Sequence, residues 1–179
     1  MSNKIVLSVS NNGGTSFSGT TANVRTLPTA TGLRAQQPTD QWFHWLAFTR
    51  RGKLIVANYD RAFGDSETTG TSDFTVSSTS NLSTFNFDTR RVTGSSMPVP
   101  TQFNDAQGAS LFWGDYAGVA AAGDSAVPIW SDTRQPDVFT CPGTPAPGTS
   151  PQLCNATEPN GLLANDEDIF TDSVDLPGR

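Results

Sequence analysis

Turn-forming residues are spread so evenly along this chain of 179 residues that no long helix fits between them. Gly, Pro, Ser, Thr, Asn and Asp recur every few residues, and no stretch repeats apolar residues at helical spacing. Short runs rich in β-branched and aromatic residues lie between these turn signals instead. The pattern predicts an all-β fold and leaves a sandwich, a barrel and a propeller open.

We expect the strands to follow one another as hairpins and to form antiparallel meanders. Gly52, in the segment TRRGK, supplies the positive φ of one tight turn, and Gly123 does the same for another. The predicted strands cover residues 4–10, 23–27, 43–49, 54–60, 72–78, 86–93, 110–122, 126–132 and 168–175.

One pattern occurs twice, in residues 42–63 and again in residues 111–135. Each copy has an aromatic-rich strand, a Gly turn, an apolar strand and an ending that joins an aspartate to an arginine. The two copies are about 70 residues apart, which exceeds a propeller blade of roughly 40–50 residues. Loop insertions account for the excess, and the segment between Cys141 and Cys154 is one of them.

The charge balance argues against nucleic acid and acidic membranes as partners. The formal net charge is -6, and the 11 Lys and Arg residues are scattered rather than clustered. No apolar run approaches the roughly 20 residues that span a bilayer. The N-terminus lacks the apolar centre of a signal peptide. We expect a secreted or cell-surface protein whose export signal lies upstream of this chain.

The two cysteines, Cys141 and Cys154, lie in a segment dense in Pro, Gly, Thr and Ser. The chain has one histidine and no CxxC pair, so we expect no metal site, and no motif predicts a cofactor. A disulfide between the cysteines would restrain the unfolded chain by roughly 3 kcal/mol and would indicate an oxidising compartment. Two free thiols are the alternative.

Residues 10–17, SNNGGTSF, resemble the Asp-box of sialidase-like propellers, S-x-D-x-G-x-T-W. Ser10, Gly14 and Phe17 fit the pattern, and Asn12 replaces its aspartate. Asn caps backbone amides in a tight turn as Asp does, Gly takes a conformation closed to other residues, and we expect Phe17 to pack under the hairpin. A weaker echo, STSNLSTF, covers residues 78–85 and lacks the glycine.

Longer segments resemble bacterial sialidase-like, Asp-box-repeat proteins. They are residues 112–134, with FGDY-x-G and W-[ST]-D-T-R elements, and residues 40–63 and 167–177. The resemblance implies antiparallel meander blades of an incomplete six-bladed propeller. Residues 1–27 would be the outer strands of one blade with the Asp-box, 41–93 one blade, and 110–176 most of another. Either this is a C-terminal portion of a longer protein, or copies of the chain close a ring.

Sialidases, as the family implies, bind a substrate carboxylate with three arginines and use a tyrosine nucleophile activated by a glutamate, with an aspartate as acid/base. The resemblance makes Asp115, Tyr116 and Asp60 candidate catalytic residues. It makes Arg61, Arg134 and Asp132 candidate substrate-binding residues. Salt bridges or turn caps that recur with the repeat are the alternative. No glutamate is clearly placed to activate a tyrosine, and the arginine triad is incomplete.

Two functions follow from this reading. The first is part of a secreted sialidase-like propeller that acts on glycans, with exo-glycosidase chemistry in the complete protein. The second is a non-catalytic propeller module that binds carbohydrate or protein. We expect the tryptophans, including Trp45 and Trp130, to serve packing more than sugar stacking, and His44 to be a packed strand residue.

Overall fold

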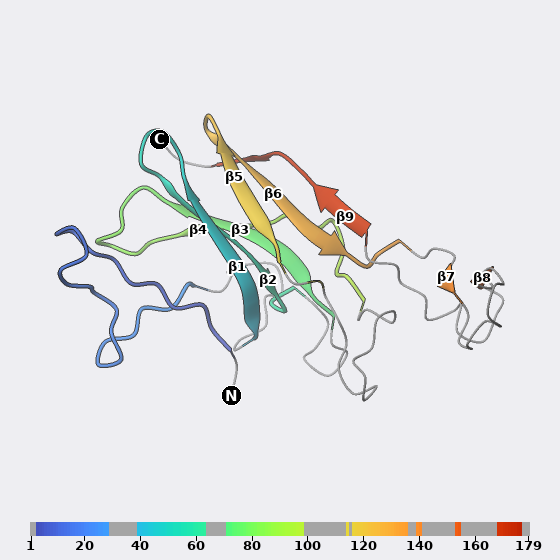
Figure 1. The fold of residues 1–179 in the computed structure, drawn as a ribbon, viewed down its shortest axis with the longest axis horizontal. Helices are drawn as coiled ribbons and strands as arrows, with labels where there is room; N and C mark the ends of the chain where they lie inside the picture. Colours follow the sequence, from blue (N-terminus) through green and yellow to red (C-terminus); the bar gives the residue numbers. More distant parts are fainter. Residues whose placement is uncertain are drawn as a thin grey trace, which may run out of the picture.

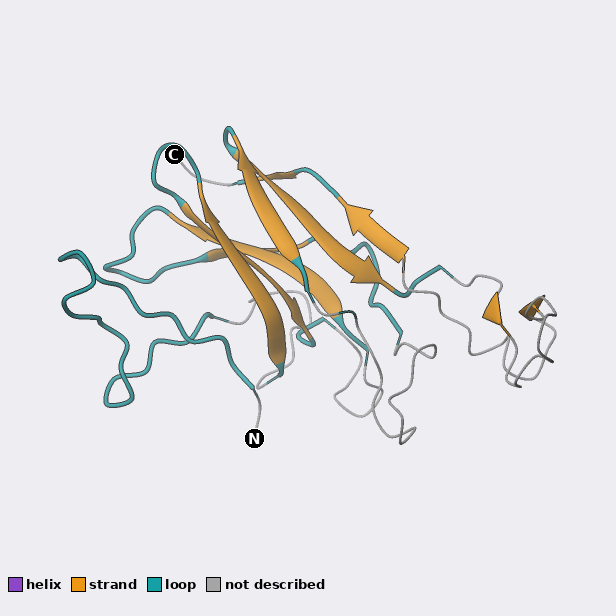
Figure 2. Cartoon of the chain, viewed as in Figure 1, coloured by secondary structure: helices purple, strands orange, loops and turns teal. Residues whose placement is uncertain are grey.

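The computed structural model describes residues 3–28, 39–63, 71–98, 114, 116–135, 139–140, 153–154 and 168–176. These residues form strands and loops and no helix (Figure 2). None of them therefore belongs to a helix that could cross a membrane. All strand pairs are antiparallel, which confirms the predicted all-β, antiparallel fold.

The first sheet is a four-stranded meander in the order β1-β2-β3-β4. Its strands are β1 (Gln41–Phe48), β2 (Leu54–Asp60), β3 (Asp73–Thr79) and β4 (Asp88–Arg91). The turn between β1 and β2 contains Gly52 at φ 81°, as the sequence predicts, because this conformation strains any residue with a Cβ.

The second sheet has β6 (Ser125–Asp132) at its centre. It pairs with β5 (Gly118–Ala122) on one side and with β9 (Asp168–Thr171) and β10 (Val174–Asp175) on the other. A separate pair joins β7 (Phe139–Thr140) to β8 (Leu153–Cys154). No closed barrel or propeller forms in the described part of the chain, so the assignment of the sheets to propeller blades stays a prediction.

Residues 4–27 form a loose antiparallel hairpin, which we call the N-terminal hairpin. Isolated bridges join Val6 to Thr26 and Val9 to Ser18. The Leu27 amide donates to the carbonyl of Ile5 at 2.8 Å. The predicted outer strands therefore lie beside each other, but they pair only through these bridges.

All seven residues of β2 are buried, because both faces of this strand are covered. Successive side chains of a strand point to opposite faces. Leu54 and Val56 pack in one cluster with Ile5, Leu7 and Leu27 of the N-terminal hairpin. The intervening side chains Ile55, Ala57 and Tyr59 belong to the core shared with the second sheet. The chain thus stacks three layers, with the hairpin and β6 on opposite sides of the first sheet (Figure 1).

A row of aromatic rings ties the two sheets together. Its neighbouring ring centroids lie 4.9–6.1 Å apart, in the order Trp42, Tyr59, Phe74, Trp130, Phe170. Each such pair stabilises the fold by about 0.5–1.5 kcal/mol beyond the contribution of its buried area. Packing is the predicted use of the tryptophans. Trp130, only 3% exposed, confirms this prediction, whereas Trp45, 50% exposed, contradicts it.

Strand β1 lies at the edge of the first sheet, and its residues are less buried than predicted for His44. Its register shifts between Trp42 and Trp45, and Phe43 has φ 44° within this bulge. Residues 43–46, in the bulge and directly after it, are exposed. The prediction that His44 is a packed strand residue is therefore wrong, since it lies in the irregular part of an edge strand.

Candidate functional site

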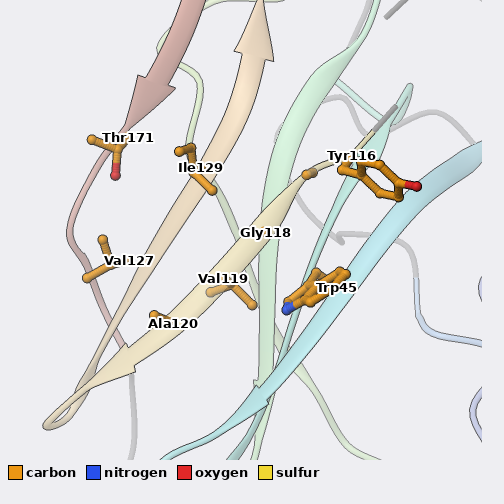
Figure 3. A pocket seen from close by; sticks show the side chains of 9 residues that line it. Trp45, Tyr116, Gly118, Val119, Ala120, Val127, Ile129 and Thr171 are labelled. Carbon is orange, nitrogen blue, oxygen red and sulfur yellow. The ribbon is translucent and has the colours of Figure 1, made fainter. Parts of the chain in front are cut away.

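An open groove of about 660 Å³ lies on the outer face of the second sheet. Trp45 of β1 and Tyr116, just before β5, stand on one side of it, while Val127, Ile129 and Thr171 stand on the other (Figure 3). Strands β1 and β5 come from distant parts of the sequence, so the groove depends on how the two sheets pack.

The register of the second sheet explains the hollow. Gly118 faces Ile129 across the β5–β6 pair, and Ala120 faces Val127. Residues opposite each other point to the same face, so two small residues line up against two branched ones. A Cβ at Gly118 would meet Cγ2 of Ile129 at 3.0 Å, so a larger residue here would displace that side chain.

The chemistry of the groove is apolar. Trp45 is 50% exposed and Tyr116 81% exposed, so both rings are open to a partner. None of the described lining residues is acidic or basic. The Thr171 hydroxyl donates to the Pro128 carbonyl at 2.8 Å, which leaves it only acceptor capacity. The groove can bury an apolar surface, and none of its described lining residues could activate Tyr116 as a nucleophile.

Asp60 lies at the end of β2 and is buried. Its Oδ1 accepts from the Ala62 amide at 2.9 Å, and its Oδ2 accepts from the Thr75 hydroxyl at 3.1 Å. Burial raises the pKa of Asp60 from 3.8 to about 6, although both hydrogen bonds oppose the shift. Arg61 pairs with Asp40 at 3.7 Å and lies over the ring of Trp42. Neither predicted site residue lines the groove.

Asp132 and Arg134 form one unit at the end of β6. Both carboxylate oxygens of Asp132 accept from Arg134, at 2.7–3.1 Å, and Oδ2 also accepts from the Trp130 indole at 2.9 Å. Burial opposes ionisation of Asp132, but the hydrogen bonds from Arg134 and Trp130 outweigh it, so its pKa lies below 3.8. This is the ion pair that the sequence left as the alternative to substrate binding.

The structure therefore brings Asp132 to Arg134 but does not bring Tyr116 to either of them. Tyr116 lines the groove, whereas Arg134 contacts Phe170 on the other face of the second sheet. Asp115, the remaining catalytic candidate, lies outside the described residues.

The Asp-box segment forms a capped turn. The Ser10 hydroxyl accepts from the Gly14 amide at 2.8 Å, and Asn12 Oδ1 accepts from the Ser16 amide at 3.0 Å. Gly14 has φ 87°, the conformation for which a glycine was predicted. Phe17 is 54% exposed, so the prediction that it packs under the hairpin is wrong. The ring lies on the outside of a hairpin whose other face packs on the first sheet.

The echo at residues 78–85 forms a similar turn between β3 and β4. The Thr79 hydroxyl accepts from the Asn81 amide at 3.1 Å, as that of Ser10 accepts from Asn12 at 3.4 Å. The Thr84 hydroxyl donates to the Asn81 carbonyl at 3.3 Å, as that of Thr15 donates to the Asn12 carbonyl at 3.0 Å. The two turns thus share their capping chemistry.

Sequence reasoning missed one polar centre and the floor of the groove. Asp73, fully buried at the start of β3, accepts from Arg91, Thr93 and Ser96 at 2.6–2.8 Å. Nothing near Asp73 in the sequence indicates these partners. The floor has a sequence signal in Gly118 and Ala120, which lie two residues apart in one strand and so place two small side chains on one face.

The described residues contain no cluster of three metal-ligating side chains. Cys141 lies outside them, and Cys154 is described only as part of β8, so the Cys141–Cys154 disulfide stays a prediction. Comparisons of the chain with protein-family models, curated proteins and solved structures found no match.

Proposed function

We propose that this chain is a non-catalytic β-sheet module of the sialidase-like propeller type that binds a protein partner through the groove. The apolar lining of the groove carries the proposal. Trp and Tyr are enriched in protein interfaces, where their rings bury large areas, and Trp45 and Tyr116 present their rings to solvent here.

The bonding of the candidate catalytic residues supports a non-catalytic module. Asp60 and Asp132 are 1% and 0% exposed and are held by turn amides and neighbouring side chains. A general acid or a nucleophile must reach a substrate atom within hydrogen-bond distance. These two carboxylates act as caps of β2 and β6 instead.

The assignment to the propeller type is supported by the sequence resemblance and by two structural features that occur twice. Asn12 and Asn81 cap similar turns, each at the tip of a hairpin. Asp60 and Asp132 end the second strand of their sheets, and each accepts from the amide two residues further on. Repeated local chemistry in successive layers is typical of a repeat architecture.

A glycan-active protein is the second candidate, and the exposed rings of Trp45 and Tyr116 favour it. The C–H face of a sugar ring stacks on an aromatic side chain, so the same rings would suit a glycan. Under this second candidate, the chain is part of a secreted sialidase-like propeller with exo-glycosidase chemistry in the complete protein.

Dye binding, a glycan panel and a fluorogenic sialoside separate the two candidates. We expect anilinonaphthalene sulfonate to bind the wild-type chain and to bind much less to Trp45→Ala. Phe17→Ala is the matched control, since Phe17 is 54% exposed but lies on the N-terminal hairpin. We expect no sialoside turnover and no glycan binding. Turnover, or glycan binding that Trp45→Ala abolishes, would overturn the protein-binding proposal in favour of the second candidate.

A further inference from the structure

The two sheets of this molecule face the same way along the stack of layers. Asp60 and Asp132 mark equivalent ends of β2 and β6, because each caps the amide two residues further on. In β2 the face that bears Asp60 also bears Leu54 and Val56, which pack on the N-terminal hairpin. In β6 the face that bears Asp132 also bears Trp130, which packs against the first sheet. Each sheet therefore turns its Asp-bearing face toward the preceding layer.

The opposite faces differ in what covers them. In the first sheet this face bears Ile55, Ala57 and Tyr59, and the second sheet buries all three. In the second sheet it bears Val127 and Ile129, and Ile129 is 48% exposed. Among the described residues no further layer lies on it. We call this surface the open face; it consists of Gly118, Ala120, Val127, Ile129, Ile169 and Thr171.

The other end of the stack is apolar as well. Ile5, Leu7 and Leu27 turn inward to the first sheet, and the alternate residues of the hairpin turn outward. Two of these outward residues, Val6 and Val24, are 50% and 53% exposed. Since Val6 pairs with Thr26, the same register places Ser8 beside Val24. We call Val6, Ser8, Val24 and Thr26 the N-terminal face.

We propose that a second copy of this chain docks its N-terminal face onto the open face. Such a contact would continue between molecules the stacking that joins the three layers within one molecule. It rests on the proposed function, because most residues of the open face also line the groove, and it identifies the protein partner. The residues named for the two faces are uncharged, and Asp175, which pairs with Ser125 on the same side of β6 as Val127, places one carboxylate at the edge of the open face. Because the two faces are different surfaces, the contact is head-to-tail and yields rings or filaments.

Two charge substitutions and their mixture test this geometry. Ile129→Lys blocks the open face, and Val24→Lys blocks the N-terminal face. By sedimentation velocity we expect the wild-type chain to associate as concentration rises, and each variant alone to stay monomeric. An equimolar mixture should form a one-to-one dimer, because each variant still has one intact face.

Three outcomes would overturn the proposal. A wild-type chain that is monomeric at every concentration rules out a second copy as the partner, whereas loss of dye binding in Trp45→Ala would still support the groove as a binding site. Association that Ile129→Lys blocks and Val24→Lys does not block indicates contact between two open faces. A mixture that stays monomeric excludes the head-to-tail arrangement. Far-UV circular dichroism checks folding, and Ala120→Lys replaces Ile129→Lys if the latter does not fold.

Discussion

The hydroxyl of Tyr59 in β2 binds the backbone of Ser131 in β6 through both of its hydrogen-bonding functions. It donates to the Ser131 carbonyl at 2.9 Å and accepts from the Ser131 amide at 2.9 Å. The hydroxyl is fully buried in the row of aromatic rings that joins the sheets. This tyrosine therefore fixes one sheet against the other and has no hydroxyl function left for a substrate.

Replacing Tyr59 by phenylalanine removes both hydrogen bonds and leaves the ring in place. The Ser131 amide and carbonyl would lose these buried contacts with the hydroxyl, so we expect the free energy of unfolding to fall by about 1–3 kcal/mol. Urea denaturation monitored by tryptophan fluorescence measures the change. Tyr116→Phe is the control, and we expect it to stay within about 0.5 kcal/mol, because this hydroxyl is on an 81% exposed side chain. Equal losses in the two variants would contradict the role of Tyr59.

Arg134→Met tests whether Arg134 is structural. The change leaves the carboxylate of Asp132 buried without its ion-pair partner, so we expect a loss of about 3 kcal/mol in unfolding free energy. Arg51→Met is the matched control, since Arg51 and Asp124 form a pair with 73% and 71% exposed side chains. A loss no larger than that of the control would show that the Asp132–Arg134 pair does not hold the end of β6.

The parts of the fold that depend on local chemistry were predictable from the sequence. Gly52 and Gly123 predicted two hairpin turns, and both have positive φ, because a tight turn needs this conformation whatever lies around it. The predicted strand at residues 54–60 coincides with β2. The apolar run at its start, residues 54–57, is explained by burial on both faces.

The parts that depend on contacts between distant segments were not predictable. Tyr59 and Tyr116 each lie beside an aspartate in the sequence, yet one is fully buried and the other is 81% exposed. His44 is exposed because β1 lies at a sheet edge, which its own sequence does not reveal. The groove likewise arises where β1 meets β5, so neither segment alone could predict it.

Asn12 offers a test of the Asp-box turn. We expect Asn12→Ala to speed amide exchange at Ser16 and to cost about 1 kcal/mol, because the amide loses its acceptor at 3.0 Å. Asn12→Asp restores the residue of the Asp-box pattern and keeps the acceptor, so its exchange should match the wild type. Hydrogen exchange followed by NMR measures both variants. Protection that survives in Asn12→Ala would show that the side chain does not cap this turn.

The buried carboxyl of Asp60 should make stability fall as the pH rises. Its pKa is about 6 in the folded chain against 3.8 for an ordinary aspartate, so the folded chain binds more protons than the unfolded chain between these values. The free energy of unfolding then decreases from about pH 4 to about pH 6, on the order of 3 kcal/mol in total. Asp132 affects stability in a separate pH range. Because its pKa is lowered, its ionised form stabilises the fold, and this stability is lost only as the pH falls below about 4.

Asp60→Asn isolates this contribution from the other titrating groups. The amide keeps an oxygen for the Ala62 amide, and it carries no charge at any pH. The unfolding free energy of the wild type minus that of the variant, measured by urea denaturation, should therefore decrease between about pH 4 and about pH 6. A difference that stays constant over this range would mean that Asp60 ionises in the folded chain as easily as in the unfolded chain. Its burial at the end of β2 would then not restrict its charge.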